Sequence, residues 1–220
     1  MKQEIDTPNI DIREDYLLKK DYLLELLLQD KTTGNNILWA TDSYEQNGKK
    51  YAPLAPITSD LVTGKNGKLI QPRAAKSKEE QLLRTRDKAE VFTPLSIVKQ
   101  MNDACDTKRV TKNNWQEYVS LLKLEITCGE APFIVSRYDP VSDKQELLPL
   151  KKRVGFLDKK LSVVSKYCNT HDEWLKWAKI AFQSSYGYEW QGDSLLIARE
   201  NLLYTFIDYY KDKFKKNPSL

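Results

Sequence analysis

One short stretch of the sequence combines residue types that could hold a ligand. In LEITCGEAPF, residues 124–133, an apolar segment typical of a buried strand leads into Thr127, Cys128 and Gly129. A turn that approaches a bound molecule needs small residues, because glycine has no side chain and accepts unusual backbone angles. Glu125 and Glu130 flank this turn, and either carboxylate is placed to hold an ammonium group. We therefore expect a strand that ends in a tight, ligand-binding turn.

Two further segments carry complementary chemistry. Glu189 follows the short predicted strand YGYEW, residues 186–190, and precedes a long helical pattern. A carboxylate at the end of a strand can accept hydrogen bonds from both hydroxyl groups of a ribose, as in doubly wound nucleotide-binding folds. Phe92 and Thr93 precede Pro94, a residue well suited to the start of a helix. The three segments are therefore candidates for one binding crevice at the carboxyl ends of the strands.

These segments also carry a family resemblance. Taken together, AEVFTPLSIVKQM (89–101), LEITCGEAPF (124–133) and YGYEWQGDSLLIARENLL (186–203) resemble the cofactor-binding half of the amino-DNA methyltransferases, of the adenine-N6 type found in restriction–modification systems. The resemblance covers roughly residues 80–205. It implies an α/β, Rossmann-like fold that binds S-adenosylmethionine. The residues that match the family's motifs, and are therefore expected to bind this cofactor, are Phe92, Thr93, Pro94, Glu125, Thr127, Cys128, Gly129, Phe133, Glu189 and Trp190.

The same resemblance implies a reaction, the transfer of a methyl group from S-adenosylmethionine to adenine N6 in DNA. The family performs it with an Asn- or Asp-Pro-Pro-aromatic tetrapeptide, whose ring stacks on the flipped base. This chain has only NPSL at 217–220, which resembles a helix stop more than a catalytic motif. We therefore expect the chain alone to be inactive and its catalytic residues to be supplied by a missing C-terminal half or by a specificity or restriction subunit.

Other departures from the family pattern leave two alternatives open. Ala131 stands where the family has a second glycine, Ile126 stands where it has a proline, and 64 residues separate Glu125 from Glu189, with an insertion at about 139–170. One alternative is a non-catalytic accessory or regulatory subunit that binds S-adenosylmethionine or DNA. The other is a DNA-binding interaction protein that has lost the cofactor, and its DNA affinity would depend on salt.

The cysteines and the histidine exclude several other chemistries. Cys105, Cys128 and Cys168 are odd in number and widely spaced, which gives neither a disulfide framework nor a zinc site. His171 is the only histidine and reads as a surface residue near a helix start. The N-terminus lacks the apolar segment of a signal peptide, so the expected location is the cytoplasm, with no membrane partner.

A basic stretch is the candidate for DNA contacts. The chain has a formal net charge of +4, which permits nucleic-acid binding without arguing for it. Within residues 71–88, Arg84, Arg86 and Lys88 could contact phosphates. Because Glu79, Glu80 and Asp87 lie among them, a solvated helix face is the more ordinary explanation.

The elements that must position these residues follow from local patterns. The turn signal DKTTGNN predicts a β-hairpin with strands near 24–29 and 36–41, although the first apolar run also fits a helix. We expect a helix at 76–89 and further helices that begin after Pro94, after Thr170 and after Gln191. A short helix should lead into a strand at about 121–127, and residues 139–165 are expected to form loop and short strand. The alternation after residue 112 predicts at least two parallel strands. We expect an N-terminal extension at 1–75 and a partial methyltransferase domain at 76–220.

Overall fold

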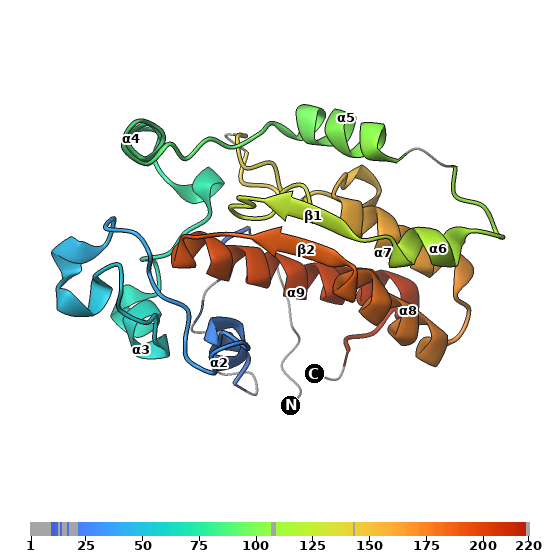
Figure 1. Ribbon diagram of the computed structural model, residues 1–220, viewed down its shortest axis with the longest axis horizontal. Coiled ribbons are helices and arrows are strands. Elements are labelled where there is room, and N and C mark those ends of the chain that lie inside the picture. Colours follow the sequence, from blue (N-terminus) through green and yellow to red (C-terminus); the bar gives the residue numbers. More distant parts are fainter. Residues whose placement is uncertain are drawn as a thin grey trace.

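The computed structural model describes residues 10–12, 14, 17, 22–106, 109–142 and 144–218. Within these residues the protein is mostly helical, and its sheet has two strands, β1 (Lys123–Ile126) and β2 (Ser185–Tyr188) (Figure 1). The helices are α2 (Leu23–Leu28), α3 (Ser59–Val62), α4 (Lys78–Lys88), α5 (Leu95–Cys105), α6 (Trp115–Ser120), α7 (Phe156–Tyr167), α8 (His171–Gln183) and α9 (Gly192–Phe214). Short 3₁₀ turns lie at Glu45–Asn47, Lys49–Tyr51, Gly64–Asn66, Arg73–Ala75 and Leu150–Lys152.

The Rossmann-like α/β sheet expected from the family resemblance is therefore wrong. The prediction of at least two parallel strands is confirmed, because β1 and β2 pair in parallel from Lys123 opposite Ser185 to Ile126 opposite Tyr188. No third strand joins them in the part of the chain that the structure describes. The sequence between the two strands contributes two helices instead, α7 and α8, so the polypeptide there builds a helical layer.

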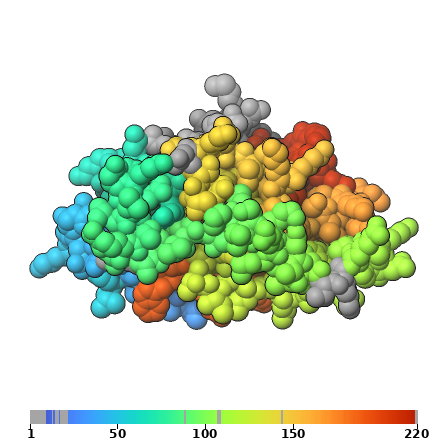
Figure 2. Space-filling view, turned by 90° about the horizontal axis from the view of Figure 1, so that it is seen from above, coloured from blue at the N-terminus to red at the C-terminus, as the bar shows by residue number. Residues whose placement is uncertain are grey.

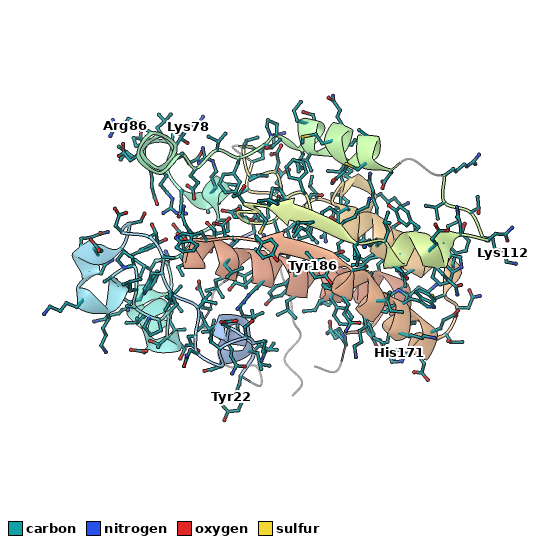
Figure 3. The ribbon with its side chains drawn as sticks, in the orientation of Figure 1. Tyr22, Lys78, Arg86, Lys112, His171 and Tyr186 are labelled. Atoms are coloured by element: carbon teal, nitrogen blue, oxygen red, sulfur yellow. The ribbon has the colours of Figure 1, made fainter. Side chains whose placement is uncertain are left out.

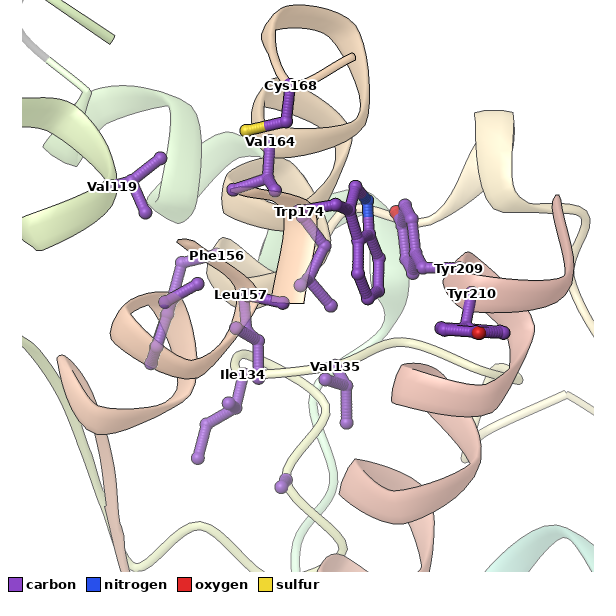
Figure 4. Close-up of a cluster of buried hydrophobic side chains, with 14 of the residues drawn as sticks. Val119, Ile134, Val135, Phe156, Leu157, Val164, Cys168, Trp174, Tyr209 and Tyr210 are labelled. Carbon is purple, nitrogen blue, oxygen red and sulfur yellow. The ribbon is translucent and has the colours of Figure 1, made fainter. Parts of the chain in front are cut away.

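Helix α7 is the element that the sequence reading missed, since 139–165 was expected to be loop and short strand. Its apolar residues Phe156, Leu157, Leu161 and Val164 recur at helical spacing and are all buried. They enter a large core cluster with Trp174 of α8 and Tyr209 of α9 (Figure 4). Burial of this face outweighs the β-branched residues of the segment, which favour strands.

The predicted N-terminal β-hairpin is also wrong, and the helix alternative for its first half is correct. Leu24 and Leu28, four residues apart on α2, are buried. The turn itself forms as expected, because the Asp30 carboxylate accepts hydrogen bonds from the backbone N–H groups of Thr32 and Thr33. Beyond the turn, pairing is limited to single antiparallel bridges, Gln29 with Asn36 and Leu38 with Pro56.

Helix α9 connects the two halves of the molecule. One of its faces, with Ala198, Tyr209 and Tyr210, packs in the cluster around α7 and α8, and the other, with Leu196 and Ile207, packs against α2, α3 and the segment between them. The residues of the expected extension, up to 75, therefore share a core with the last helix. Seen from above, the segment that contains α4 and α5 crosses the middle of the molecule (Figure 2).

The contact at the start of α9 allows a direct test of this arrangement. The Gly192 N–H donates to Trp39 O at 2.9 Å, and a Cβ at Gly192 would lie 2.0 Å from Leu38 O. We expect Gly192→Ala to lower the free energy of unfolding by about 2–3 kcal/mol, because backbone must move to admit the methyl group. Urea unfolding measures this, with Arg86→Ala on the exposed face of α4 as a control expected to change stability by less than about 0.5 kcal/mol. A Gly192→Ala protein as stable as this control would contradict the packing.

Candidate functional site

Three segments that are distant in the sequence line one pocket of about 320 Å³. They are the connection between α4 and α5, the end of β1 with its following loop, and the end of β2 with the start of α9. Nine of the ten residues predicted to bind the cofactor line this pocket: Phe92, Thr93, Glu125, Thr127, Cys128, Gly129, Phe133, Glu189 and Trp190. The tenth, Pro94, lies next to Thr93 and caps the N-terminus of α5, outside the wall.

The loop after β1 is held in an unusual backbone conformation. Thr127, Gly129 and Ala131 all have positive φ angles, of 55°, 53° and 64°. Cys128 N–H continues the strand pairing by donating to Tyr188 O at 2.7 Å, so the loop is fixed to the end of β2. Gly129 adopts its positive φ without strain, and a Cβ there would lie 3.3 Å from the ring of Phe92, closer than ordinary contact. Ala131 is buried and takes the position expected for a second glycine.

Glu189 joins the two strand ends through its carboxylate. Its Oε2 atom accepts a hydrogen bond of 2.6 Å from Gly129 N–H, and its Oε1 atom accepts from Trp190 and Gln191 N–H at 2.9 and 3.0 Å. A carboxylate offers about four lone-pair sites. The three backbone donors occupy three of these sites, which leaves one on Oε2 for a ligand hydroxyl.

Glu125 is the second carboxylate of the pocket, and it is held neutral near pH 7. Its oxygens accept hydrogen bonds from Phe133 N–H at 3.4 Å and Ile134 N–H at 3.1 Å. Burial raises the pKa of Glu125 to about 8, since these two backbone donors only partly offset the loss of water and the charge of Glu189 adds to the increase. A cation placed beside Glu125 would draw this proton off.

The charged residue types in the described wall of the pocket are all acidic. Glu90, Glu125 and Glu189 line it, and no Lys, Arg or His is among the described residues of its wall. Burial raises the pKa of the Cys128 thiol to about 12, and the neighbouring Glu125 and Glu189 add to the rise. Cys128 is therefore a neutral thiol that fills space in the loop and is unsuited to act as a nucleophile.

Glu130, the other carboxylate considered for an ammonium group, faces away from this pocket. It is buried, and it accepts hydrogen bonds from Arg73 N–H at 2.6 Å and from the Tyr138 hydroxyl at 2.7 Å. Asn201 of α9 donates to Glu130 O at 3.0 Å, which ties the loop to the core. Glu130 therefore holds the loop in place, and Glu125 is the carboxylate available to a ligand.

Sequence reasoning missed the remaining wall of the pocket, formed by Ala89, Glu90, Val91, Pro132, Gln191 and Ser194. Each lies within four residues of a predicted site residue, so proximity to the motifs was the available signal. Glu90 matters most, because it anchors the α4–α5 connection through an ion pair with Arg84 at 2.8 Å.

The residues predicted to contact DNA divide into different environments. The Arg84 guanidinium is buried and pairs with Glu90 and with Asp193 at 2.8 Å, and Asp193 also accepts from the Tyr44 hydroxyl. Arg84 thus links α4 to the start of α9. Arg86 is exposed and pairs with Asp87 at 2.7 Å (Figure 3). The Lys88 side chain lies outside the described part of the structure.

The side chains considered for other chemistries lie apart from the pocket. His171 is the first residue of α8, and its Nε2 atom lies 2.9 Å from the hydroxyl of Tyr210 in α9. The described residues contain no group of three or more His, Cys, Asp or Glu side chains placed to hold a metal ion. In the same residues, every helix is too short or too polar to span a lipid bilayer.

Comparison with known proteins adds no assignment. No protein-family model, no curated protein and no solved structure matches this chain.

Proposed function

We propose that this chain binds S-adenosylmethionine in the pocket at the ends of β1 and β2, as the cofactor-binding part of a DNA adenine-N6 methyltransferase. One observation carries the proposal: three segments chosen for their likeness to that family, separated by up to about 100 residues, line a single pocket. Its volume falls within the range of small-molecule sites, at roughly 300–1,000 Å³.

The charge of the pocket supports this ligand over other nucleotides. S-adenosylmethionine carries a sulfonium and an ammonium group against one carboxylate, so it is a net cation. No basic side chain is in the described wall. Of its three glutamates, Glu90 is balanced by Arg84 and Glu125 is protonated near pH 7, so Glu189 carries the negative charge and Glu125 adds one when a cation draws off its proton. A nucleoside triphosphate would bring several negative charges to the same place, where like charges repel.

The carboxylates suggest how the ligand lies. Glu189, with a free lone pair on Oε2, receives a ribose hydroxyl, and Glu125 receives the ammonium of the methionine tail. The Trp190 indole is 82% exposed and follows Glu189 directly, so it offers a ring face to the adenine. Thr93 and Phe92 border the methionine end, beside the Gly129 loop.

Calorimetric titration of the full chain tests the proposal. We expect saturable binding of S-adenosylmethionine, weaker binding of S-adenosylhomocysteine, which lacks the sulfonium charge, and no binding of ATP. Equal affinity for ATP and S-adenosylmethionine would contradict the charge argument, and a folded chain that binds neither would overturn the proposal. Methyl transfer to adenine is then assayed with DNA. Binding without transfer would favour the accessory-subunit alternative unless a second polypeptide restores activity.

A further inference from the structure

The two-stranded sheet leaves one of its faces uncovered. The register pairs Leu124 with Tyr186 and Ile126 with Tyr188, so these four side chains project from the same face. They are 50%, 48%, 70% and 67% exposed, respectively. On the opposite face, Lys160 of α7 donates to the backbone at both strand starts, Leu121 O and Ser184 O. Among the residues that the structure describes, helices cover one face, and the side chains of the other face are about half to two-thirds exposed (Figure 3 labels Tyr186).

A bare face is unusual for parallel strands, which occur almost only where both faces are covered. With Leu122 at 70% and Met101 of α5 at 53% exposure, the set forms one apolar surface, which we call the open face: Met101, Leu122, Leu124, Ile126, Tyr186 and Tyr188. At about 200 Å² for a fully exposed side chain of this size, the open face covers roughly 700 Å². That exceeds the ~300–600 Å² of the largest apolar patch on a typical monomer.

The open face has both a projection and a hollow. The rings of β2 stand out into solvent, whereas the β1 side borders a groove of about 540 Å³ under α5, whose apolar lining includes Met101, Leu122, Ile126, Phe133 and Phe156. This combination suits a two-fold interface, in which the same patch of both copies must be complementary to itself. Rotation of a second copy about an axis near Leu124 and Tyr186 would bring each Tyr188 toward the groove of its partner.

The charges near the open face do not oppose such pairing. Lys123, between Leu122 and Leu124, pairs with Asp106. Glu125 is turned toward Phe133 and Ile134 N–H. Two copies would therefore meet through uncharged side chains. Each would contribute roughly 700 Å², close to the ~800 Å² per partner of a standard interface.

We propose that the open face is the interface of a two-fold symmetric dimer of this chain. It brings Leu124 and Tyr186 of the two copies together and places each Tyr188 in the groove between β1 and α5 of the other copy. The proposal does not depend on the identity of the cofactor, because none of the six residues of the open face lines the pocket. The groove and the pocket meet at Glu125 and Phe133, which line both.

Sedimentation velocity of the full chain over about 1–100 µM tests the proposal. We expect a dimer whose dissociation constant rises at least 30-fold in Ile126→Ser/Tyr188→Ser. Leu54→Ser is the matched control, since Leu54 is 84% exposed and lies outside the open face, and it should leave the dimer unchanged. A monomer at 100 µM, or a dimer that survives the double substitution, would overturn the proposal and leave the open face to a different partner.

Hydrogen exchange of the unaltered chain gives a second measurement that needs no variant. We expect peptides spanning 121–126 and 185–190 to exchange more slowly as protein concentration rises, because dimerisation covers both strands. Peptides from α8, on the helix-covered side, should not change. Exchange that is independent of concentration in the strand peptides would overturn the dimer even if the double variant failed to fold.

Discussion

Replacing Glu189 by glutamine is expected to weaken S-adenosylmethionine binding by about 100-fold, or about 2.7 kcal/mol. The carboxylate accepts three backbone hydrogen bonds, from Gly129, Trp190 and Gln191, and has a lone pair left for the ribose. An amide nitrogen in place of either oxygen would face a backbone donor, and the negative charge that attracts a cationic ligand would be lost. Calorimetry at pH 8 measures the change.

Two controls separate contact with the ligand from a general loss of structure. Glu45→Gln removes an exposed carboxylate that does not line the pocket and should bind as the unaltered chain does. A 2′-deoxy analogue of the cofactor should bind the unaltered chain more weakly, yet lose little further affinity in Glu189→Gln, because the missing hydroxyl has no carboxylate to meet. If Glu189→Gln bound the ligand with an affinity within threefold of the unaltered chain, Glu189 would not be a ligand contact.

The sequence was informative about the pocket because its motifs act over a few residues. A strand, a turn with one glycine and a strand-end carboxylate are each set by local backbone requirements, as at Gly129 and Glu189. Local patterns also identified α4, α5, α8 and α9. The parallel pairing followed from the order of these elements.

The number of strands in the sheet could not be predicted from local sequence patterns. In α7, the charged residues Asp158 and Lys160 interrupt the apolar face, yet both are buried. Asp158 accepts from Ser136 N–H at 2.8 Å, and Lys160 donates to Leu121 O and Ser184 O. These partners lie 22 to 39 residues away, so no local pattern reveals that the segment is a buried helix. The prediction for α2 was wrong for a different reason, because a six-residue run of five leucines and one glutamate fits a helix or a strand equally well.

Arg84 shows that the binding partners of a charged side chain could not be predicted from local sequence either. Its place in a basic stretch suggested contact with DNA phosphates, and only the fold reveals its carboxylate partners, of which Asp193 is 109 residues away. Such a buried pair costs much to break, since the remaining charge would be left without a partner. The basic stretch favoured a solvated helix face, with DNA contact as the alternative, whereas Arg84 is buried and pairs with carboxylates of the protein itself.

Binding of S-adenosylmethionine is expected to depend on pH through Glu125. With a pKa of about 8, this carboxyl is roughly 90% protonated at pH 7 in the free protein. An ammonium group favours the ionised form, so binding at pH 7 should release close to one proton. Affinity should therefore rise by up to tenfold per pH unit from pH 6.5 to 8 and then level off. Titrations in phosphate and in Tris, which differ in ionisation enthalpy, measure the released proton.

Glu125→Gln supplies the matched baseline, because the ligand's own groups titrate alike with both proteins. It should bind more weakly, release no proton and lose the pH dependence between 6.5 and 8. The pH dependence of the free energy of unfolding tests the raised pKa of Glu125 independently of binding. The folded carboxyl keeps its proton up to about pH 8, whereas the unfolded one loses it near 4.5, so its contribution to the free energy of unfolding is present below pH 4.5 and declines as pH rises to 8. The difference between the two proteins in urea unfolding should follow this decline. A buffer-independent binding heat at pH 7, together with a flat stability difference, would mean that Glu125 is already ionised in the free protein. A buffer-independent heat with the stability decline retained would mean that another group receives the ammonium.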